Sequence, residues 1–170
     1  MAASNSNFSV RLWFFYFTLG ALFITKLWTT QYQDTKLSSG LHDDAWFTWK
    51  AEHAYWETEE YTELTYIKEP LFPLYIKTLN DFGIPLRLGN DMAYGFALAL
   101  LAVAMLKRTG FVSVSLILCA TLLFHPYGLA VFTRSVSDAL FTILTVLWLI
   151  PFLFIFRKES PPQKRWLALW

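Results

Sequence analysis

The sequence predicts an all-α protein with multipass transmembrane helices and an external loop that carries two short juxtamembrane amphipathic helices. Of its 170 residues, 55% are hydrophobic and only 16% are charged, whereas about 25% are charged in an average soluble domain. The charges are also clustered, which leaves uncharged windows of the length that a transmembrane helix needs. Moreover, 11 of the 13 acidic residues lie between residues 31 and 91, so one polar segment separates the apolar ones.

The apolar windows divide the chain into alternating spans and connections. Lys26 lies in the last turns of the first span, from which its long side chain can reach the aqueous interface. Pro126 breaks the third span because proline removes a backbone donor, and Pro151 predicts a kink in the fourth. In chain order we predict a cytoplasmic N-terminus (1–11), a first span (12–30), an external loop (31–88), a second span (89–106), a third span with a Pro/Gly break (111–132), a fourth span (138–156), and a cytoplasmic segment with the start of a truncated fifth span (157–170).

The distribution of basic residues predicts the orientation of these spans. If the four spans alternate, the basic residues that flank them fall on one side, and flanking lysines and arginines stay cytoplasmic. The segment from 31 to 91 then lies outside, with five Lys or Arg residues against 11 Asp or Glu residues. We therefore expect an integral, multi-pass protein of a bacterial inner membrane or of the endoplasmic reticulum. The flanking basic residues are Arg11, Lys107, Arg108, Arg157, Lys158, Lys164 and Arg165.

The net charge and the cysteine content argue against two classes of function. A formal net charge of +1 gives no electrostatic basis for nucleic-acid binding. Cys119 is the single cysteine, which excludes a zinc cluster of cysteines. His42, Asp43, Asp44 and His53 have the chemistry of metal ligands but no recognised ligand spacing. We therefore predict no cofactor and no metal ligands, and a bound divalent metal is the alternative.

Asp43 and Asp44 are the candidate catalytic residues, because two adjacent carboxylates lie between the first span and an aromatic-rich stretch. One interpretation is structural, since aspartate is a preferred N-cap and the helix dipole favours carboxylates in the first turn. In the other, one aspartate is a general base that takes a proton from a sugar-type hydroxyl, and its neighbour orients it. The two roles are compatible. His42, beside the pair, is a candidate supporting residue.

Two short helices are predicted within the external loop. The first contains four residues spaced to fall on one helical face, as expected of a helix that lies at the membrane interface, where tryptophan prefers to sit. The second begins near Pro70 or Pro73, because proline suits the first helical turn, and it ends between Asn80 and Gly83. The residues on the shared face of the first helix are Trp46, Trp49, His53 and Trp56.

Three basic residues are candidates for binding a phosphate at the external side. Arg87 precedes the second span, and a guanidinium can hold a phosphate through two parallel hydrogen bonds. Lys68 lies at the edge of the second short helix, where a solvated lysine is the commoner role. Arg134 and Asp138 are four residues apart before the fourth span. They either pair on one helical turn, or Arg134 binds the phosphate with Asp138 as a supporting residue.

Taken in order, these stretches resemble the GT-C superfamily of membrane glycosyltransferases, especially its protein-mannosyltransferase-like and lipid A aminoarabinose-transferase-like branch. In that family an external loop with an acidic pair follows the first span, two juxtamembrane helices come next, and an arginine precedes the following span. The resemblance covers about residues 12–158, although family members have eight or more spans and often have Asp-Glu as the pair. The matching stretches here are Asp43-Asp44, Glu69-Pro70-Leu71-Phe72-Pro73-Leu74, Leu86-Arg87-Leu88 and the arrangement Arg134…Asp138.

The resemblance implies the N-terminal part of a glycosyltransferase that moves a sugar from a polyprenyl-phosphate-linked donor to a hydroxyl acceptor on the external or lumenal face. Asp43 or Asp44 would deprotonate the acceptor, and Arg87, Arg134 and Lys68 would hold the donor phosphate. The partners would be the lipid bilayer, the donor and the acceptor, without nucleic acid, and the chain alone is expected to be inactive. The alternative is a non-enzymatic four-span membrane protein or an inactive transferase remnant.

Overall fold

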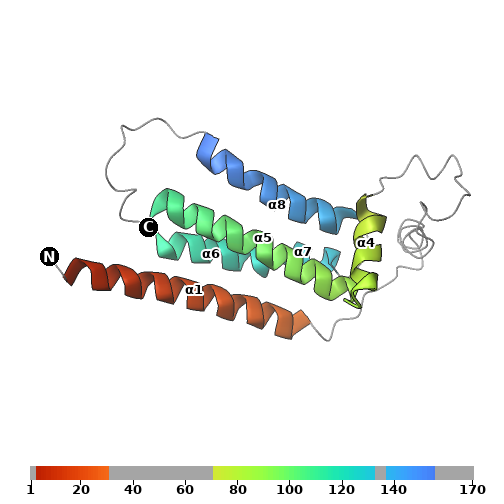
Figure 1. Cartoon of the computed structure of the whole chain (residues 1–170), viewed down its shortest axis with the longest axis horizontal. Coiled ribbons are helices and arrows are strands. Elements are labelled where there is room, and N and C mark those ends of the chain that lie inside the picture. The colour runs from red at the N-terminus through yellow and green to blue at the C-terminus, as the bar shows by residue number, and fades with distance from the viewer. Residues whose placement is uncertain (1–2, 31–70, 133–136, 156–170) are drawn as a thin grey trace, which may run out of the picture.

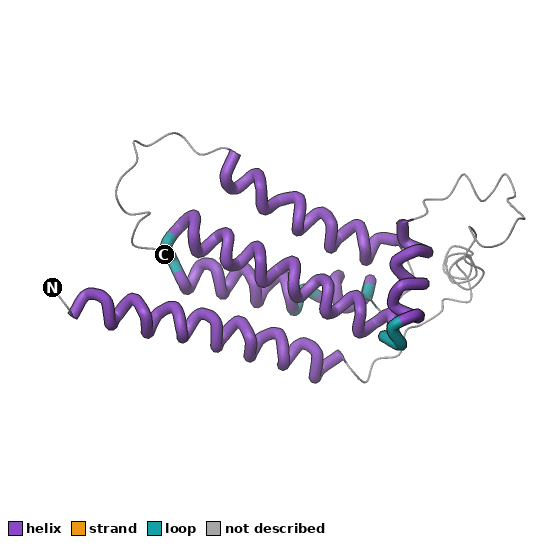
Figure 2. The backbone as a smooth tube through the Cα atoms, viewed as in Figure 1, coloured by secondary structure: helices purple, strands orange, loops and turns teal. Residues whose placement is uncertain are grey.

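A computed structural model of the chain describes residues 3–30, 71–132 and 137–155. All of the regular structure in these residues is helical, as Figure 1 and Figure 2 show, so the predicted all-α class is confirmed. In chain order the helices are α1 (Ala3–Thr30), α4 (Leu71–Asp81), α5 (Leu86–Thr109), α6 (Val112–Leu123), α7 (Pro126–Val131) and α8 (Ser137–Ile155).

Four helical segments in the described residues are long and apolar enough to cross a membrane, which confirms the multi-pass architecture. They are Val10–Thr30, Leu86–Thr109, Val112–Ala130 and Ser137–Ile155. Compared with the predicted second span over 89–106, α5 is longer at both ends. It begins at Leu86, directly after Pro85, and the charged residues of its first turns, Arg87 and Asp91, are buried and paired.

The described helices pack around α5, which contacts α1, α4, α6 and α8 and lies between α1 and α8 in Figure 1. Small residues such as Gly95, Ala97 and Ala102 are buried along it, and small side chains let membrane helices approach closely. The larger residues of this core come from α1, α5, α6 and α8. They include Phe15, Leu98, Leu101, Leu116, Leu123, Ile143 and Val146.

Three of the basic residues that flank the spans lie at one end of the bundle. Figure 1 shows that α1 ends, α5 begins and α4 lies at one end, which we call the α4 end. Arg11 lies near the start of α1, and Lys107 and Arg108 occupy the last turn of α5, so these basic residues lie toward the opposite end. Asp81 is the last residue of α4. These basic residues of α1 and α5 therefore lie at the end of the bundle opposite α4.

α4 runs across the α4 end of the bundle rather than along it (Figure 1). It is the second of the two predicted juxtamembrane helices, and it buries Phe72, Pro73 and Ile76 while Leu74 and Thr78 stay exposed. After Asp81 the chain turns through Gly83, whose φ of 66° suits glycine. The Gly83 amide donates to the carbonyl oxygen of Asn80 (2.9 Å), and the next amide donates to Leu79 (2.8 Å), which is a Schellman ending. The first predicted juxtamembrane helix lies outside the described residues.

The third crossing is broken between α6 and α7, where a break was predicted. Pro126 has no amide hydrogen, so it cannot donate to the carbonyl oxygen of Leu122 as a continuous helix would require. The hydroxyl of Tyr94 on α5 donates to that oxygen instead, at 3.1 Å. His125 caps the new helix, because its Nδ1 accepts the amide hydrogen of Tyr127 at 3.2 Å. The break is thus held by contacts to α5 and to its own first turn.

Candidate functional site

Of the residues predicted to form the site, the structure describes Arg87 and Asp138. His42, Asp43, Asp44, Lys68 and Arg134 lie outside the described residues. The chain leaves α1 at Thr30 and re-enters α4 at Leu71, and both points are at the α4 end in Figure 1. The segment that contains the two aspartates is therefore attached at both of its ends to the α4 end of the bundle.

Arg87 lies in the first turn of α5 and is only 5% exposed. Its Nε donates to Oδ2 of Asp91, one turn further along the same helix, at 3.0 Å. Its Nη1 donates to the backbone carbonyl oxygen of Leu129 in α7, at 3.1 Å. The guanidinium therefore links the start of α5 to α7 and holds the two helices together.

Asp91 also receives a second cation, from α1. The ammonium nitrogen of Lys26 lies 3.2 Å from Oδ1 of Asp91, and the side chains are 1% and 2% exposed. The contact is an ion pair that is not aligned as a hydrogen bond. The prediction that Lys26 reaches the aqueous interface is wrong, because the carboxylate of Asp91 gives its charge a partner inside the bundle. Buried charges require such partners, since losing hydration is costly.

Two further side chains, those of Asn90 and Tyr75, have buried polar atoms. Asn90 is fully buried, and within the described residues neither its amide nitrogen nor its oxygen has a hydrogen-bond partner. The hydroxyl of Tyr75 on α4 is likewise buried without such a partner. Burial and, to a smaller extent, the negative charge of Asp91 raise the pKa of Tyr75 to about 12. Tyr75 is therefore a neutral hydroxyl near the Asp91 carboxylate at physiological pH.

We call Lys26, Arg87 and Asp91 the buried polar cluster. It contains two cations and one carboxylate, so its formal charge is +1 when all three are ionised. It lies at the α4 end, because Lys26 is in the last turns of α1 and Arg87 is in the first turn of α5. A net positive charge in surroundings of low dielectric attracts anions strongly. The cluster therefore places two buried cations at this end of the bundle.

Asp138 is placed at a second position of the α4 end. It lies in the first turn of α8 and is exposed, where the helix dipole favours a carboxylate. Together with Ser137 it lines a hollow of about 340 Å³ between α8 and the start of α4, where Leu71 and Phe72 form the other wall. The structure thus brings Asp138 next to Leu71, the first residue of α4.

Among the described residues, no group of three or more His, Cys, Asp or Glu side chains could hold a metal ion. The predicted ligand candidates around His42 lie outside those residues. The buried polar cluster itself offers hydrogen-bond donors, two cations and a carboxylate.

The sequence prediction missed Lys26 and Asp91 as members of one cluster. The predicted second span (89–106) contains Asp91, but this residue was counted only among the acidic residues between 31 and 91. A usable signal was present, since Lys26 and Asp91 are opposite charges next to apolar windows of consecutive antiparallel spans. Both belong to the same end of the bundle, and charges at such depth usually pair.

Comparison of the chain with protein-family models, with curated proteins and with solved structures finds no match.

Proposed function

We propose that the protein is a membrane glycosyltransferase component that acts on a polyprenyl-phosphate-linked sugar at the α4 end of the bundle. The observation that carries the proposal is the position of the buried polar cluster. A net positive cluster lies at the same end at which the segment with Asp43 and Asp44 is attached on both sides. A carboxylate base and a cationic phosphate site are the two components that such a transfer needs.

The chemistry suits these groups. A sugar linked to a lipid phosphate departs with that phosphate as a stable anion, so the leaving group needs cations rather than a strong acid. The acceptor hydroxyl needs a base, and a carboxylate takes its proton as the new glycosidic bond forms. In this proposal Asp43 or Asp44 is the base. Arg87, Arg134 and Lys68 are the candidate phosphate ligands, while His42 and Asp138 support the reacting groups.

One observation supports the alternative of a non-enzymatic four-span membrane protein. Arg87 already binds Asp91 and the Leu129 carbonyl oxygen, and such contacts are sufficient to explain a buried arginine as a link between helices. In that case the cluster stabilises the bundle and need not bind a substrate. The two functions differ in whether polyprenyl phosphate is released, and this release can be measured.

The test uses membranes of the native host with the gene deleted and then restored as wild type or as a variant. Membranes receive a polyprenyl-phosphate-linked radiolabelled hexose, and the release of polyprenyl phosphate and the transfer of label are measured. The wild type should restore transfer, and Asp43→Asn or Asp44→Asn should lower the rate about 10²–10⁴-fold if that residue is the base. If either aspartate is only a helix cap, asparagine should replace it with little loss.

Asp81→Asn is the matched control, since it removes a carboxylate at the same end whose side chain is 62% exposed. It should retain the transfer rate of the wild type. Full transfer by the Asp43→Asn/Asp44→Asn double variant would refute the catalytic role of the pair. Equal polyprenyl phosphate release with and without the gene would favour the non-enzymatic alternative.

A further inference from the structure

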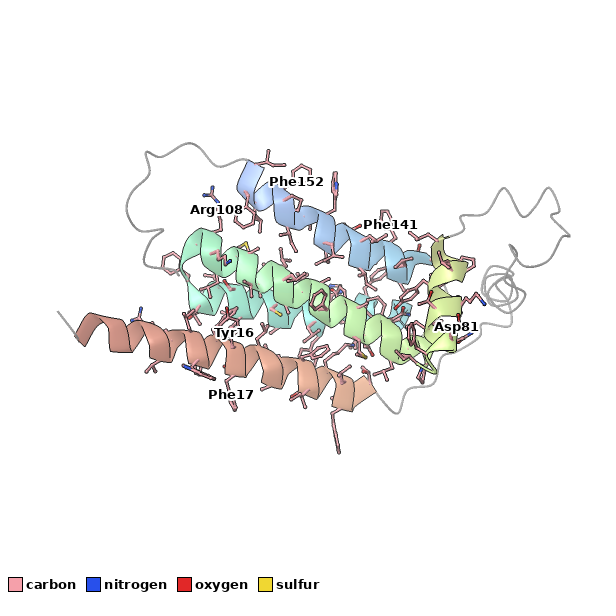
Figure 3. The ribbon with its side chains drawn as sticks, viewed as in Figure 1. Tyr16, Phe17, Asp81, Arg108, Phe141 and Phe152 are labelled. Carbon is pink, nitrogen blue, oxygen red and sulfur yellow. The ribbon has the colours of Figure 1, made fainter. Side chains whose placement is uncertain are left out.

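The position of α7 is set by contacts with other helices, although α6 and α7 belong to one crossing. Pro126 begins α7 and has no amide hydrogen to donate to the last turn of α6. From α5, Nη1 of Arg87 donates to the carbonyl oxygen of Leu129 at 3.1 Å, and α8 also contacts α7. In Figure 3, α1 with Tyr16 lies on one side of α5 and α8 with Phe141 lies on the other. An effect of α1 on α7 can therefore pass through α5.

A series of polar contacts provides such a connection. The ammonium nitrogen of Lys26 on α1 lies 3.2 Å from Oδ1 of Asp91. Nε of Arg87 donates to Oδ2 of the same carboxylate at 3.0 Å, and Nη1 donates to Leu129 in α7. We call Lys26, Asp91, Arg87 and the carbonyl oxygen of Leu129 the α1–α7 relay. Its three charged side chains are at most 5% exposed, so solvent screens their interactions little.

Lys26 determines how Asp91 meets Arg87. A carboxylate and a guanidinium prefer two parallel hydrogen bonds when both carboxylate oxygens are available. Here Oδ1 faces the ammonium group of Lys26 and accepts no hydrogen bond from the described residues, while Oδ2 accepts from Nε. This arrangement directs Nη1 toward α7. Without Lys26, Asp91 can accept from Arg87 with both oxygens and turn the guanidinium away from Leu129.

We propose that the α1–α7 relay is a conformational coupling device, in which the last turns of α1 control how firmly α7 is held. While Lys26 faces Asp91, Arg87 holds α7 through Leu129. When α1 withdraws Lys26, Arg87 turns to Asp91 and loosens α7. The inference does not depend on the proposed function, because it concerns contacts between described helices. A movement of α1 at the α4 end is thereby transmitted across α5 to the helix beyond the break.

The test measures amide hydrogen exchange, resolved by residue, in the purified full chain in phosphatidylcholine nanodiscs. The amides of Leu129 and Phe132 report on α7, because they donate within it to His125 and Gly128, each at 3.1 Å. The middle of α6 is the internal reference. Lys26→Met should accelerate exchange in α7 about 3–30-fold relative to α6, the usual size of coupling between distant sites.

Thr30→Val is the matched control. The hydroxyl of Thr30 is buried in the same turns of α1 and donates to the carbonyl oxygen of Lys26 at 2.8 Å, so valine disturbs this end of α1 without removing the ion pair. It should leave the ratio of α7 to α6 exchange unchanged.

A double-mutant cycle identifies the route of the coupling. In an Arg87→Lys background, Lys26→Met should change exchange in α7 by less than about twofold, because the planar fork is already lost. In a Tyr94→Phe background it should keep its full effect. That variant removes the hydroxyl bond to the Leu122 carbonyl oxygen but keeps the ring that packs against Phe132, and neither contact belongs to the relay.

Four outcomes would overturn the proposal. Unchanged exchange in α7 of Lys26→Met would show that α1 and α7 are not coupled. Equal acceleration of α6 and α7, or an equal effect of Thr30→Val, would show a general loss of stability. A full effect of Lys26→Met in the Arg87→Lys background would show a route that bypasses Arg87.

Discussion

Lys26 and Asp91 form a buried ion pair between α1 and α5, with 3.2 Å between the ammonium nitrogen and the carboxylate oxygen. Because Asp91 also accepts a hydrogen bond from Arg87, one carboxylate is the shared partner of two cations. Removal of Asp91 would leave Lys26 and Arg87 buried without this shared counter-charge.

We predict that Asp91→Leu lowers the free energy of unfolding by about 3–5 kcal/mol, the usual effect of breaking a buried pair. Lys26→Met should cost less, because Asp91 keeps its bond to Arg87. Thermal unfolding in detergent, followed by near-ultraviolet circular dichroism, measures both. Asp81→Asn is the control, since its exposed pair with Lys77 spans 3.9 Å and should be worth at most about 1 kcal/mol. A loss of similar size in Asp91→Leu and the control would show that the Asp91 pair is not buried.

Gly95 and Gly20 offer a matched pair of substitutions. Gly95→Ala should destabilise the protein by about 1–3 kcal/mol, because the new methyl group overlaps Phe23 and overpacks the contact between α1 and α5. Gly20→Ala should be neutral or stabilising by up to about 1 kcal/mol, since it meets open space and alanine favours helix. Unfolding temperatures measured side by side decide this. Phe23→Leu should partly rescue Gly95→Ala, and a lack of rescue would argue against the overlap.

The raised pKa of Tyr75 predicts a change in stability at alkaline pH. Between the ordinary tyrosine pKa of about 10 and the folded value of about 12, the folded state holds a proton that the unfolded state has lost. The stabilisation of the folded state by the protonated Tyr75 hydroxyl is therefore fully present below about pH 10, and it decreases as the pH rises toward 12. Tyr75→Phe should flatten this part of the stability curve, measured as wild type minus variant. At neutral pH it should cost little, because the buried hydroxyl has no partner among the described residues. Identical alkaline slopes would contradict the assignment.

Arg87→Lys tests whether Arg87 links helices or binds phosphate. Lysine keeps the positive charge, but its single ammonium nitrogen cannot reproduce the two hydrogen bonds that the planar guanidinium donates to Asp91 and to the Leu129 carbonyl oxygen. We expect a loss of about 1.5–3 kcal/mol, typical of a hydrogen bond to a charged group, and faster amide hydrogen exchange in α7. Exchange in the middle of α6 serves as the internal control. Weaker binding of polyprenyl phosphate with unchanged exchange in α7 would instead assign Arg87 to the phosphate.

The predicted orientation is tested by labelling single cysteines in intact cells. Cys119 is first replaced by serine, and cysteines are then introduced one at a time as Ser39→Cys and Ser160→Cys. An impermeant thiol reagent should label the first variant from outside and the second only after permeabilisation, because positive flanks stay cytoplasmic. Labelling of both variants from outside would reject the orientation.

The helices and several of their ends were predictable because their signals are local. The uncharged windows indicate the spans, Pro126 indicates the break between α6 and α7, and Gly83 indicates the end of α4. Each of these signals acts within one or two helical turns of its residue. The predicted helix class therefore needed no knowledge of how the helices pack.

The buried polar cluster was not predicted, because it depends on how distant segments pair. Asp91 appears as one more acid of the external segment until α1 places Lys26 beside it. Nothing in the sequence distinguishes Gly20, where an added Cβ atom would meet open space, from Gly95, where an added Cβ atom would overlap the ring of Phe23. The roles of Asp43, Asp44, His42, Lys68 and Arg134 stay predictions, since these residues lie outside the described part of the chain.

The pairing of Lys26 with Asp91 also bears on how the protein is made. The ribosome synthesises α1 first, so Lys26 enters the insertion machinery before its counter-charge exists. Asp91 follows only after residues 31–90 have been synthesised. During that interval the first span carries a lysine that lipid solvates poorly. We therefore expect the stable release of α1 into the bilayer to depend on the arrival of α5, so that the two helices integrate together.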